Sequence, residues 1–86
     1  MGNKLNNNIP YRVSLKDDLN VKILYDEFNG ECFNEMDQLV VVVNPGDDSG
    51  VVIEDVDGEE HCIVPSKLFV SKELFDRIKL LRKNNY

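Results

Sequence analysis

The segment "DDLNVKILYDEFNG", residues 17–30, determines which architecture the rest of the chain can adopt. Apolar residues recur in it at every second position: Leu19, Val21, Ile23 and Tyr25. A period of two is the signature of a half-buried strand. A helix over residues 15–28, with Ser14 as its N-cap and Gly30 as its stop, is the competing interpretation. Because the apolar residues are scattered around the circumference of such a helix, we predict a strand here.

Further strands are predicted on both sides of this segment. Apolar and polar residues alternate from Tyr11 to Lys16, and the continuous apolar run Leu39–Val43 is typical of a strand buried on both faces. Asn29 and Gly30 suit a tight turn, so residues 26–37 are predicted to form a long acidic loop. The stretch "NPGDDSG", residues 44–50, is predicted to be a turn.

The stretch "DVDGEEHC", residues 55–62, combines acidic residues with the only histidine and one of the two cysteines. Asp57 and Gly58 predict a two-residue type I′ hairpin turn, because such a turn needs positive φ at both positions. A hairpin centred there pairs Glu54 with His61. The same register places four apolar residues on one face of the hairpin: Val51, Ile53, Cys62 and Val64.

This geometry argues against a metal site or a catalytic site in the hairpin. His61 and Cys62 are neighbours on a strand, so they point to opposite faces and cannot bind one ion together. An EF-hand alignment would place Ile53 and Val64 at ligand positions. Cys32 with His61 is the remaining nucleophile and base, and nothing in the sequence places them together. We therefore predict no enzymatic activity, no metal and no cofactor.

The C-terminal segment, residues 71–86, is predicted to be an amphipathic helix and tail. Ser71 suits the N-cap position. The apolar stripe has helical spacing and is predicted to pack on the core: Leu74, Phe75, Ile78 and Leu81. Residues 1–9 have no periodicity and are predicted to form a flexible arm, which leaves residues 10–70 for the main domain.

Charge is distributed unevenly along the chain of 86 residues, whose net charge is −6. Twelve acidic residues and no Lys or Arg lie between Ile23 and Ser66, while the basic residues lie outside that stretch. No apolar run is long enough to span a membrane, and the N-terminus has no apolar core of a secretion signal. These features predict a small, monomeric, cytoplasmic domain with two reduced cysteines and no contact with a membrane.

The middle of the chain resembles the Src-homology-3 (SH3) family. The motif "ILYDE", residues 23–27, looks like the family's ALYDY box, and "DQLVVVV", residues 37–43, looks like its second strand. Residues 47–70 have the family's order of loop, strand, tight turn, strand and single-turn helix, the last in "PSKLFV". The resemblance implies a mainly β fold, an SH3-like antiparallel barrel of five strands, to which this chain adds a C-terminal α-helix.

In the SH3 family, two loops frame a shallow aromatic groove that binds a proline-rich peptide, and acidic loop residues pair with its Arg or Lys. By position, Tyr25 and Pro65 match groove residues of the family. Glu27, Val51 and Leu68 stand where the family has aromatic residues. The resemblance therefore implies a groove around Tyr25, Pro65 and Leu68, flanked by acidic residues of the loops: Glu27, Glu31, Glu35, Asp47 and Asp48.

Two functions of different classes are open at this point. The first is a protein-binding module, an adaptor or inhibitor, whose acidic loops dock on the basic surface of another protein. An inhibitor that imitates nucleic acid, as small phage proteins do, is a special case of this function. The alternative is a nucleic-acid-binding barrel that uses basic residues of the first strand and the C-terminal helix. Its candidate contacts are Arg12, Lys16, Lys22, Lys79, Arg82 and Lys83.

Overall fold

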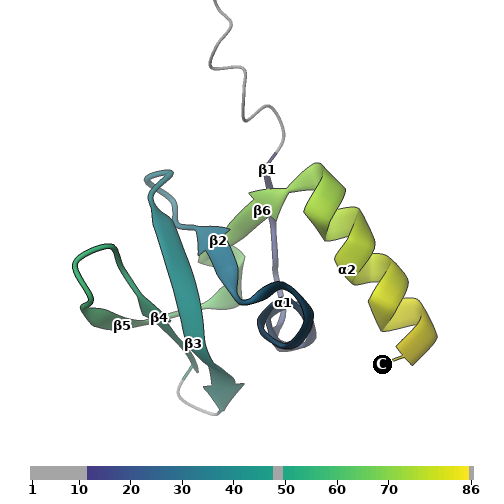
Figure 1. Ribbon diagram of the computed structural model, residues 1–86, viewed down its shortest axis with the longest axis horizontal. Coiled ribbons are helices and arrows are strands. Elements are labelled where there is room, and N and C mark those ends of the chain that lie inside the picture. The colour runs from purple at the N-terminus through teal and green to yellow at the C-terminus, as the bar shows by residue number, and fades with distance from the viewer. Residues whose placement is uncertain (1–11, 48–49, 86) are drawn as a thin grey trace, which may run out of the picture.

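The computed structural model describes residues 12–47 and 50–85, except for the side chains of Asp47 and Asn85. It contains one antiparallel sheet and two α-helices (Figure 1). In chain order the elements are β1 (Arg12–Ser14), α1 (Asp18–Phe28), β2 (Glu31–Phe33), β3 (Leu39–Asp47), β4 (Gly50–Glu54), β5 (Glu60–Ile63), the single 3₁₀ turn η2 (Pro65–Lys67), β6 (Phe69–Ser71) and α2 (Lys72–Asn85).

The sheet has six strands in the order β1-β6-β2-β3-β4-β5. β1 and β5 are its two edges, so the sheet is open. The prediction of a mainly β, antiparallel fold with a C-terminal helix is confirmed, and the prediction of a five-stranded barrel is wrong. Neither helix in the described part of the chain is long and apolar enough to cross a membrane.

The segment predicted as a strand over residues 19–25 is instead helix α1, and this changes the architecture. Asp17 is its N-cap, and the Asp17 carboxylate accepts a hydrogen bond from the Asn20 N–H at 3.0 Å. Asn29 ends the helix in the left-handed conformation with φ 65°, and Gly30 follows with φ 75°.

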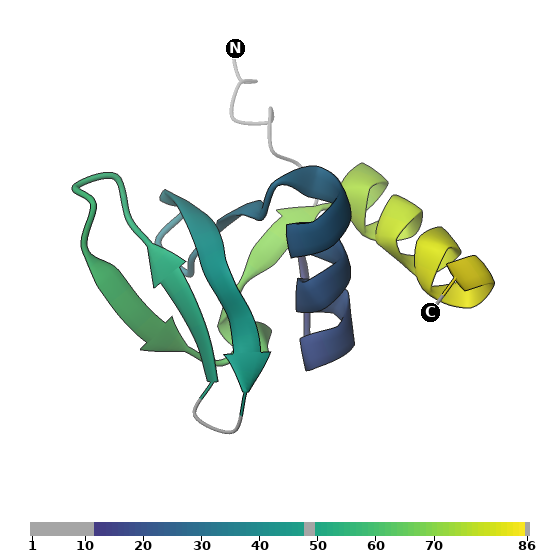
Figure 2. The same cartoon turned by 60° about the horizontal axis from the view of Figure 1, so that its bottom comes forward.

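The position of α1 explains why its sequence looks like a strand. The helix packs against β3 on one side and α2 on another, and Figure 2 shows it between the sheet and α2. Its buried residues therefore occupy more than one face: Asn20, Val21, Ile23 and Leu24. A helix that is covered on two sides lacks the single apolar stripe of a surface helix.

The hairpin of β4 and β5 has a different register from the prediction. Val51 pairs with Ile63, and Ile53 pairs with His61, one residue away from the predicted pairs. The turn has three residues instead of two, since the Asp55 N–H donates to the Glu59 carbonyl oxygen at 3.0 Å. Gly58 has φ 84° as predicted, but Asp57 is not among the residues with positive φ, so the predicted type I′ turn is wrong.

This register reverses which side chains of β5 face the core. Ile63 packs against the core beside Val51, whereas Cys62 and Val64 are exposed. A shift of one residue moves every side chain of a strand to the other face of the sheet. The predicted apolar face with Cys62 and Val64 is therefore wrong.

Helix α2 starts where the sequence predicts. The Ser71 hydroxyl oxygen accepts a hydrogen bond from the Leu74 N–H at 3.1 Å, which is an N-cap interaction. Ile78 is completely buried, while Leu74, Phe75 and Leu81 pack partly buried against the same core. The apolar stripe of this helix therefore packs on the domain, as predicted.

A polar cluster joins the start of α1 to the end of α2. Asn20 is 3% exposed, and its side-chain amide donates to the Leu15 carbonyl oxygen. Arg82 donates to the Asn20 Oδ1 at 2.8 Å and to the Asp17 Oδ2 at 3.1 Å. Arg77 of α2 also lies close to Phe28 at the end of α1, so α2 contacts α1 at both of its ends.

The positive φ of Gly58 generates the first prediction. Replacing Gly58 with Val should destabilise the protein by about 1 kcal/mol or more, because a β-branched residue resists positive φ. A Cβ at this position meets no atom within 4 Å, so the cost comes from the backbone alone. Gly58→Asn is the matched control, since Asn tolerates the left-handed region. Equal melting temperatures for the wild type and Gly58→Val would contradict the assignment.

The Asp17 N-cap generates a prediction about pH. Partial burial alone would raise the pKa of Asp17, but the Asn20 N–H and the Arg82 guanidinium stabilise the carboxylate and bring the pKa below the ordinary 3.8. A lowered pKa in the folded state means that the carboxylate stabilises the fold above pH 3.8, and that this is lost as the pH falls further.

Asp17→Asn is the variant that tests it, because Asn also caps helices well. The variant should lose about 0.5 kcal/mol at pH 7, the size of an exposed ion pair. Urea unfolding at several pH values should show the difference from wild type shrinking once the pH falls below the ordinary pKa of 3.8. A difference that stays constant down to the lowest pH would contradict the ion pair.

Candidate functional site

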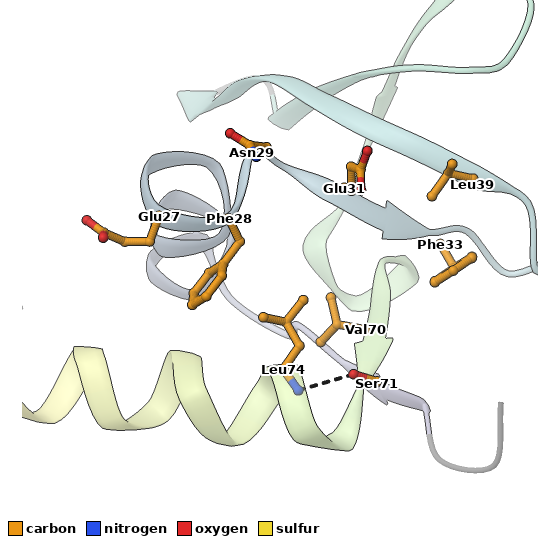
Figure 3. A pocket seen from close by; sticks show the side chains of 9 residues that line it. All are labelled: Glu27, Phe28, Asn29, Glu31, Phe33, Leu39, Val70, Ser71 and Leu74. Atoms are coloured by element: carbon orange, nitrogen blue, oxygen red, sulfur yellow. Dashed lines mark hydrogen bonds between the residues drawn. The ribbon is translucent and has the colours of Figure 1, made fainter. Parts of the chain in front are cut away.

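A groove of about 420 Å³ opens where β2 and β6 meet the two helices. β2 pairs with β3 over its whole length, but with β6 through the single bridge Phe33↔Phe69. Because the two strands share only this bridge, side chains from both helices reach the space beside it. Figure 3 shows the groove with the nine residues that line it.

The floor of this groove is apolar and its edge is acidic. Its apolar residues come from five elements: Phe28 of α1, Phe33 of β2, Leu39 of β3, Val70 of β6 and Leu74 of α2. In Figure 3, Phe28 and Leu74 point toward one another beside Val70. Glu27 and Glu31 are the charged lining residues, and the lining includes no Lys or Arg. In Figure 3 the Glu27 carboxylate points away from the apolar floor. We call this site the acidic groove.

Two arginines hold aromatic rings of the groove in place. The Arg12 guanidinium carbon lies 4.4 Å from the centroid of the Phe33 ring, and the same group contacts the Asp37 carboxylate at 2.6 Å. Arg77 of α2 lies 4.9 Å from the centroid of the Phe28 ring. Cation–π contacts of this kind orient a ring as well as stabilise it. The floor of the groove is therefore preorganised by residues that are not part of its lining.

Only part of the predicted protein-binding site comes together. Glu27 and Glu31 both line the acidic groove, and Tyr25 is exposed on α1 outside its lining. Glu35 lies in the turn after β2, where it contacts Lys67 at 3.6 Å. Pro65 begins η2 and is partly buried.

Leu68 is 0% exposed, so the interpretation of Leu68 as a groove residue is wrong. Its side chain belongs to the core instead of the surface. Asp47 ends β3 and its side chain is not described, while Asp48 lies outside the described residues.

The sequence interpretation missed the apolar floor. β2 falls inside the segment predicted as a loop, so Phe33 had no predicted neighbours. Phe28 was placed in the same loop, although it ends α1. The signal that could have located them is the pair of caps at Asp17 and Asn29, which fixes the helix and starts β2 directly after it.

The basic residues predicted for nucleic acid divide into two groups. Lys16, Lys79, Arg82 and Lys83 line one open pocket of about 690 Å³, together with Asp17, Asn20 and Phe75. This basic pocket lies between the start of α1 and the C-terminal half of α2. Lys22 pairs with Asp26 on α1. Arg12 is packed between Phe33 and Asp37, so the structure does not bring it together with the basic residues of this pocket.

A third cluster lies at the hairpin of β4 and β5. Donor atoms of Asp55, Glu59 and His61 all lie within 4.8 Å of one another, and these are residue types that bind metals. The His61 Nε2 is 2.9 Å from the Asp55 Oδ2, which replaces the predicted pair of Glu54 with His61. This hydrogen bond, with the N–H groups of Glu59 and Asp57, lowers the pKa of Asp55. The cluster is largely exposed, and its contacts already explain its geometry.

The two cysteines have opposite environments. Cys32 is buried on β2, and burial raises the pKa of its thiol to about 12. Cys62 is exposed on the edge strand β5. β3 and β4 lie between β2 and β5, so the structure does not bring Cys32 and His61 together as a nucleophile and a base.

Comparison of the chain with protein-family models, with curated proteins and with solved structures gives no match.

The cysteine environments generate a prediction about reactivity. An aromatic disulfide reagent at pH 8 should modify Cys62 within minutes and Cys32 only after unfolding, because the thiolate is the reactive form. Absorbance of the released thiol should show one reacting group in the native protein and two in denaturant. Cys62→Ser is the control, which should remove the fast phase. A fast phase that persists in this variant would place Cys32 at the surface.

Proposed function

We propose that the protein is a small, non-enzymatic, protein-binding module, an adaptor or inhibitor, whose acidic groove docks on a basic surface of another protein. The observation that carries the proposal is the lining of this groove, which combines an apolar floor with Glu27 and Glu31 and includes no Lys or Arg.

The floor of the groove suits one apolar side chain of a partner. Leu39 is 43% exposed although it lies beside Phe33 in the lining, so it offers apolar surface to a partner. Burying apolar area gives about 25 cal/mol per Å², so one inserted leucine or aromatic residue supplies most of the affinity.

The acidic edge suits a Lys or Arg next to that apolar residue. Glu31 is exposed and forms no ion pair with another described residue. Lys and Arg have apolar stems and charged ends, so one such side chain can cover Leu39 and still reach Glu31. We infer that the partner presents Lys or Arg beside a leucine, methionine or aromatic residue.

The uneven charge of the chain supports the same kind of partner. Twelve acidic residues and no basic residue lie between positions 23 and 66, which include both acids of the groove. A field of one sign speeds the encounter with a partner of opposite sign and weakens with salt.

The order of elements supports a relationship to SH3-like domains, although the sheet here is open and has six strands. Strands β3, β4 and β5 form an antiparallel meander, and η2 separates β5 from β6, which lies beside β2. This is the order of strands and single-turn helix that the family shows near its C-terminus. The chain departs from that family in α1, since "ILYDE" lies in a helix. The groove is accordingly proposed at the end of α1 instead of around Tyr25.

The proposal predicts which acids control binding. An array of short peptides that combine Lys or Arg with a leucine or aromatic residue supplies the probes, and anisotropy measures the affinity of the best one. Glu27→Gln with Glu31→Gln should weaken this peptide about tenfold, mainly in the association rate. Leu39→Gln should weaken it without any change of charge, because it removes apolar floor.

Matched variants distinguish an effect of the groove residues from an effect of the overall net charge. Glu59→Gln with Glu60→Gln makes the same change of charge at the distant hairpin, and should leave affinity nearly unchanged. Lys79→Gln with Lys83→Gln should also have little effect. If the hairpin variant or the lysine variant loses the peptide while the groove variant retains it, the proposed site is wrong.

A further inference from the structure

The basic pocket has the opposite charge from the acidic groove. Its lining has four cationic side chains, Lys16, Lys79, Arg82 and Lys83, and one carboxylate, that of Asp17. The helix dipole accounts for Arg82 and Lys83, which lie in the last turn of α2, but it does not account for Lys16 or Lys79. We propose that this pocket binds a small phosphate-bearing ligand with an aromatic ring, the chemistry of a mononucleotide.

Lys16 and Lys83 are available to a ligand, whereas Arg82 is engaged and the Lys79 ammonium lies over the Phe75 ring. Arg82 contacts both Asp17 and Asn20, which fixes its position. Lys16, Lys79 and Lys83 form no ion pair with any residue in the described part of the chain. Ammonium groups act as compact point charges and suit a phosphate dianion, whereas a planar carboxylate favours the fork of an arginine.

Lys16 is held at the pocket in an unfavourable backbone conformation. Its φ is 70°, and the Asp17 N–H donates to the Leu15 carbonyl oxygen at 2.8 Å in a three-residue turn centred on Lys16. Leu15 is completely buried and its N–H donates to the Leu68 carbonyl oxygen at 2.8 Å, which anchors the turn. Glycine would fit this φ without strain, so the lysine side chain is retained at a cost in stability.

Phe75 gives the pocket an apolar wall beside these cations. Its side chain is partly buried in the lining, and the Lys79 Nζ lies 5.8 Å from the centroid of its ring. A base can therefore contact the ring while its phosphate reaches Lys79. Stacking of a base on an aromatic side chain contributes about 1–3 kcal/mol in nucleic-acid-binding proteins.

The size and surroundings of the pocket favour a small ligand over an extended nucleic acid. A volume of about 690 Å³ lies within the range of small-molecule sites. Arg12 and Lys22 are engaged elsewhere, so they do not extend the basic surface of the pocket within residues 12–47 and 50–85. The acidic middle of the chain would also repel a long phosphate backbone.

Titration of the ¹⁵N-labelled protein with a nucleoside monophosphate tests the proposal by backbone amide shifts. Signals of Lys16, Asn20, Phe75 and Lys79 should move and saturate. Inorganic phosphate should move the lysine signals at higher concentration, and the nucleoside without phosphate should move none. Lys79→Gln with Lys83→Gln should weaken binding of the monophosphate at least tenfold. Lys22→Gln with Lys72→Gln makes the same change of charge outside the pocket, with one residue on each helix, and should leave the affinity unchanged.

Two further variants distinguish a ligand contact from a structural role. Lys16→Gly should keep or raise the melting temperature, because it relieves the positive φ, and yet weaken the monophosphate several-fold. Phe75→Leu should reduce the preference for the monophosphate over inorganic phosphate. The proposal is overturned if no signal saturates, if the Lys22 and Lys72 variant loses as much affinity, or if an oligonucleotide binds far more tightly than the monophosphate with a steep dependence on salt. The last result would identify a nucleic-acid site instead.

Discussion

The buried amide of Asn20 is the interaction on which the arrangement of the domain depends. It donates to the Leu15 carbonyl oxygen after β1 and accepts from Arg82 near the end of α2. A buried amide without partners costs about 1–3 kcal/mol, so these two contacts must form together. These contacts hold the start of α1 against the last turns of α2. Asp17, the N-cap of α1, also accepts a hydrogen bond from Arg82 and so strengthens the same contact.

The open sheet and its two pockets follow from the position of α1. The helix packs between β3 and α2, so it covers a face of the sheet that would lie inside a closed barrel. The end of α1 meets the start of α2 at the acidic groove. The start of α1 meets the end of α2 at the basic pocket. One helix pair thus positions two sites with opposite charge.

Sequence reasoning located the features that depend on local chemistry and missed those that depend on tertiary packing. The Ser71 cap, the buried stripe around Ile78 and the positive φ at Gly58 all follow from local preferences. A strand starts at Leu39 as predicted, but Leu39 and Val43 are exposed instead of buried on both faces, and the strand continues to Asp47 into the segment predicted as a turn. Helix α1 was missed because burial on two sides removes the single apolar stripe.

The hairpin register failed for a different reason, since a turn of two residues and a turn of three both suit Asp57 and Gly58. Of the groove, Glu27 and Glu31 could be found from charge alone. The apolar floor could not, because its residues come from five elements whose arrangement depends on α1.

The two pockets share a property that is visible in the sequence and the local backbone. Acidic residues at a helix C-terminus oppose the helix dipole, yet α1 has Glu27 and no basic residue in its last turn. At the other end of the same helix, a lysine occupies a backbone conformation that glycine favours. Each feature is locally unfavourable for stability, and each places a charged side chain in the lining of one of the two pockets.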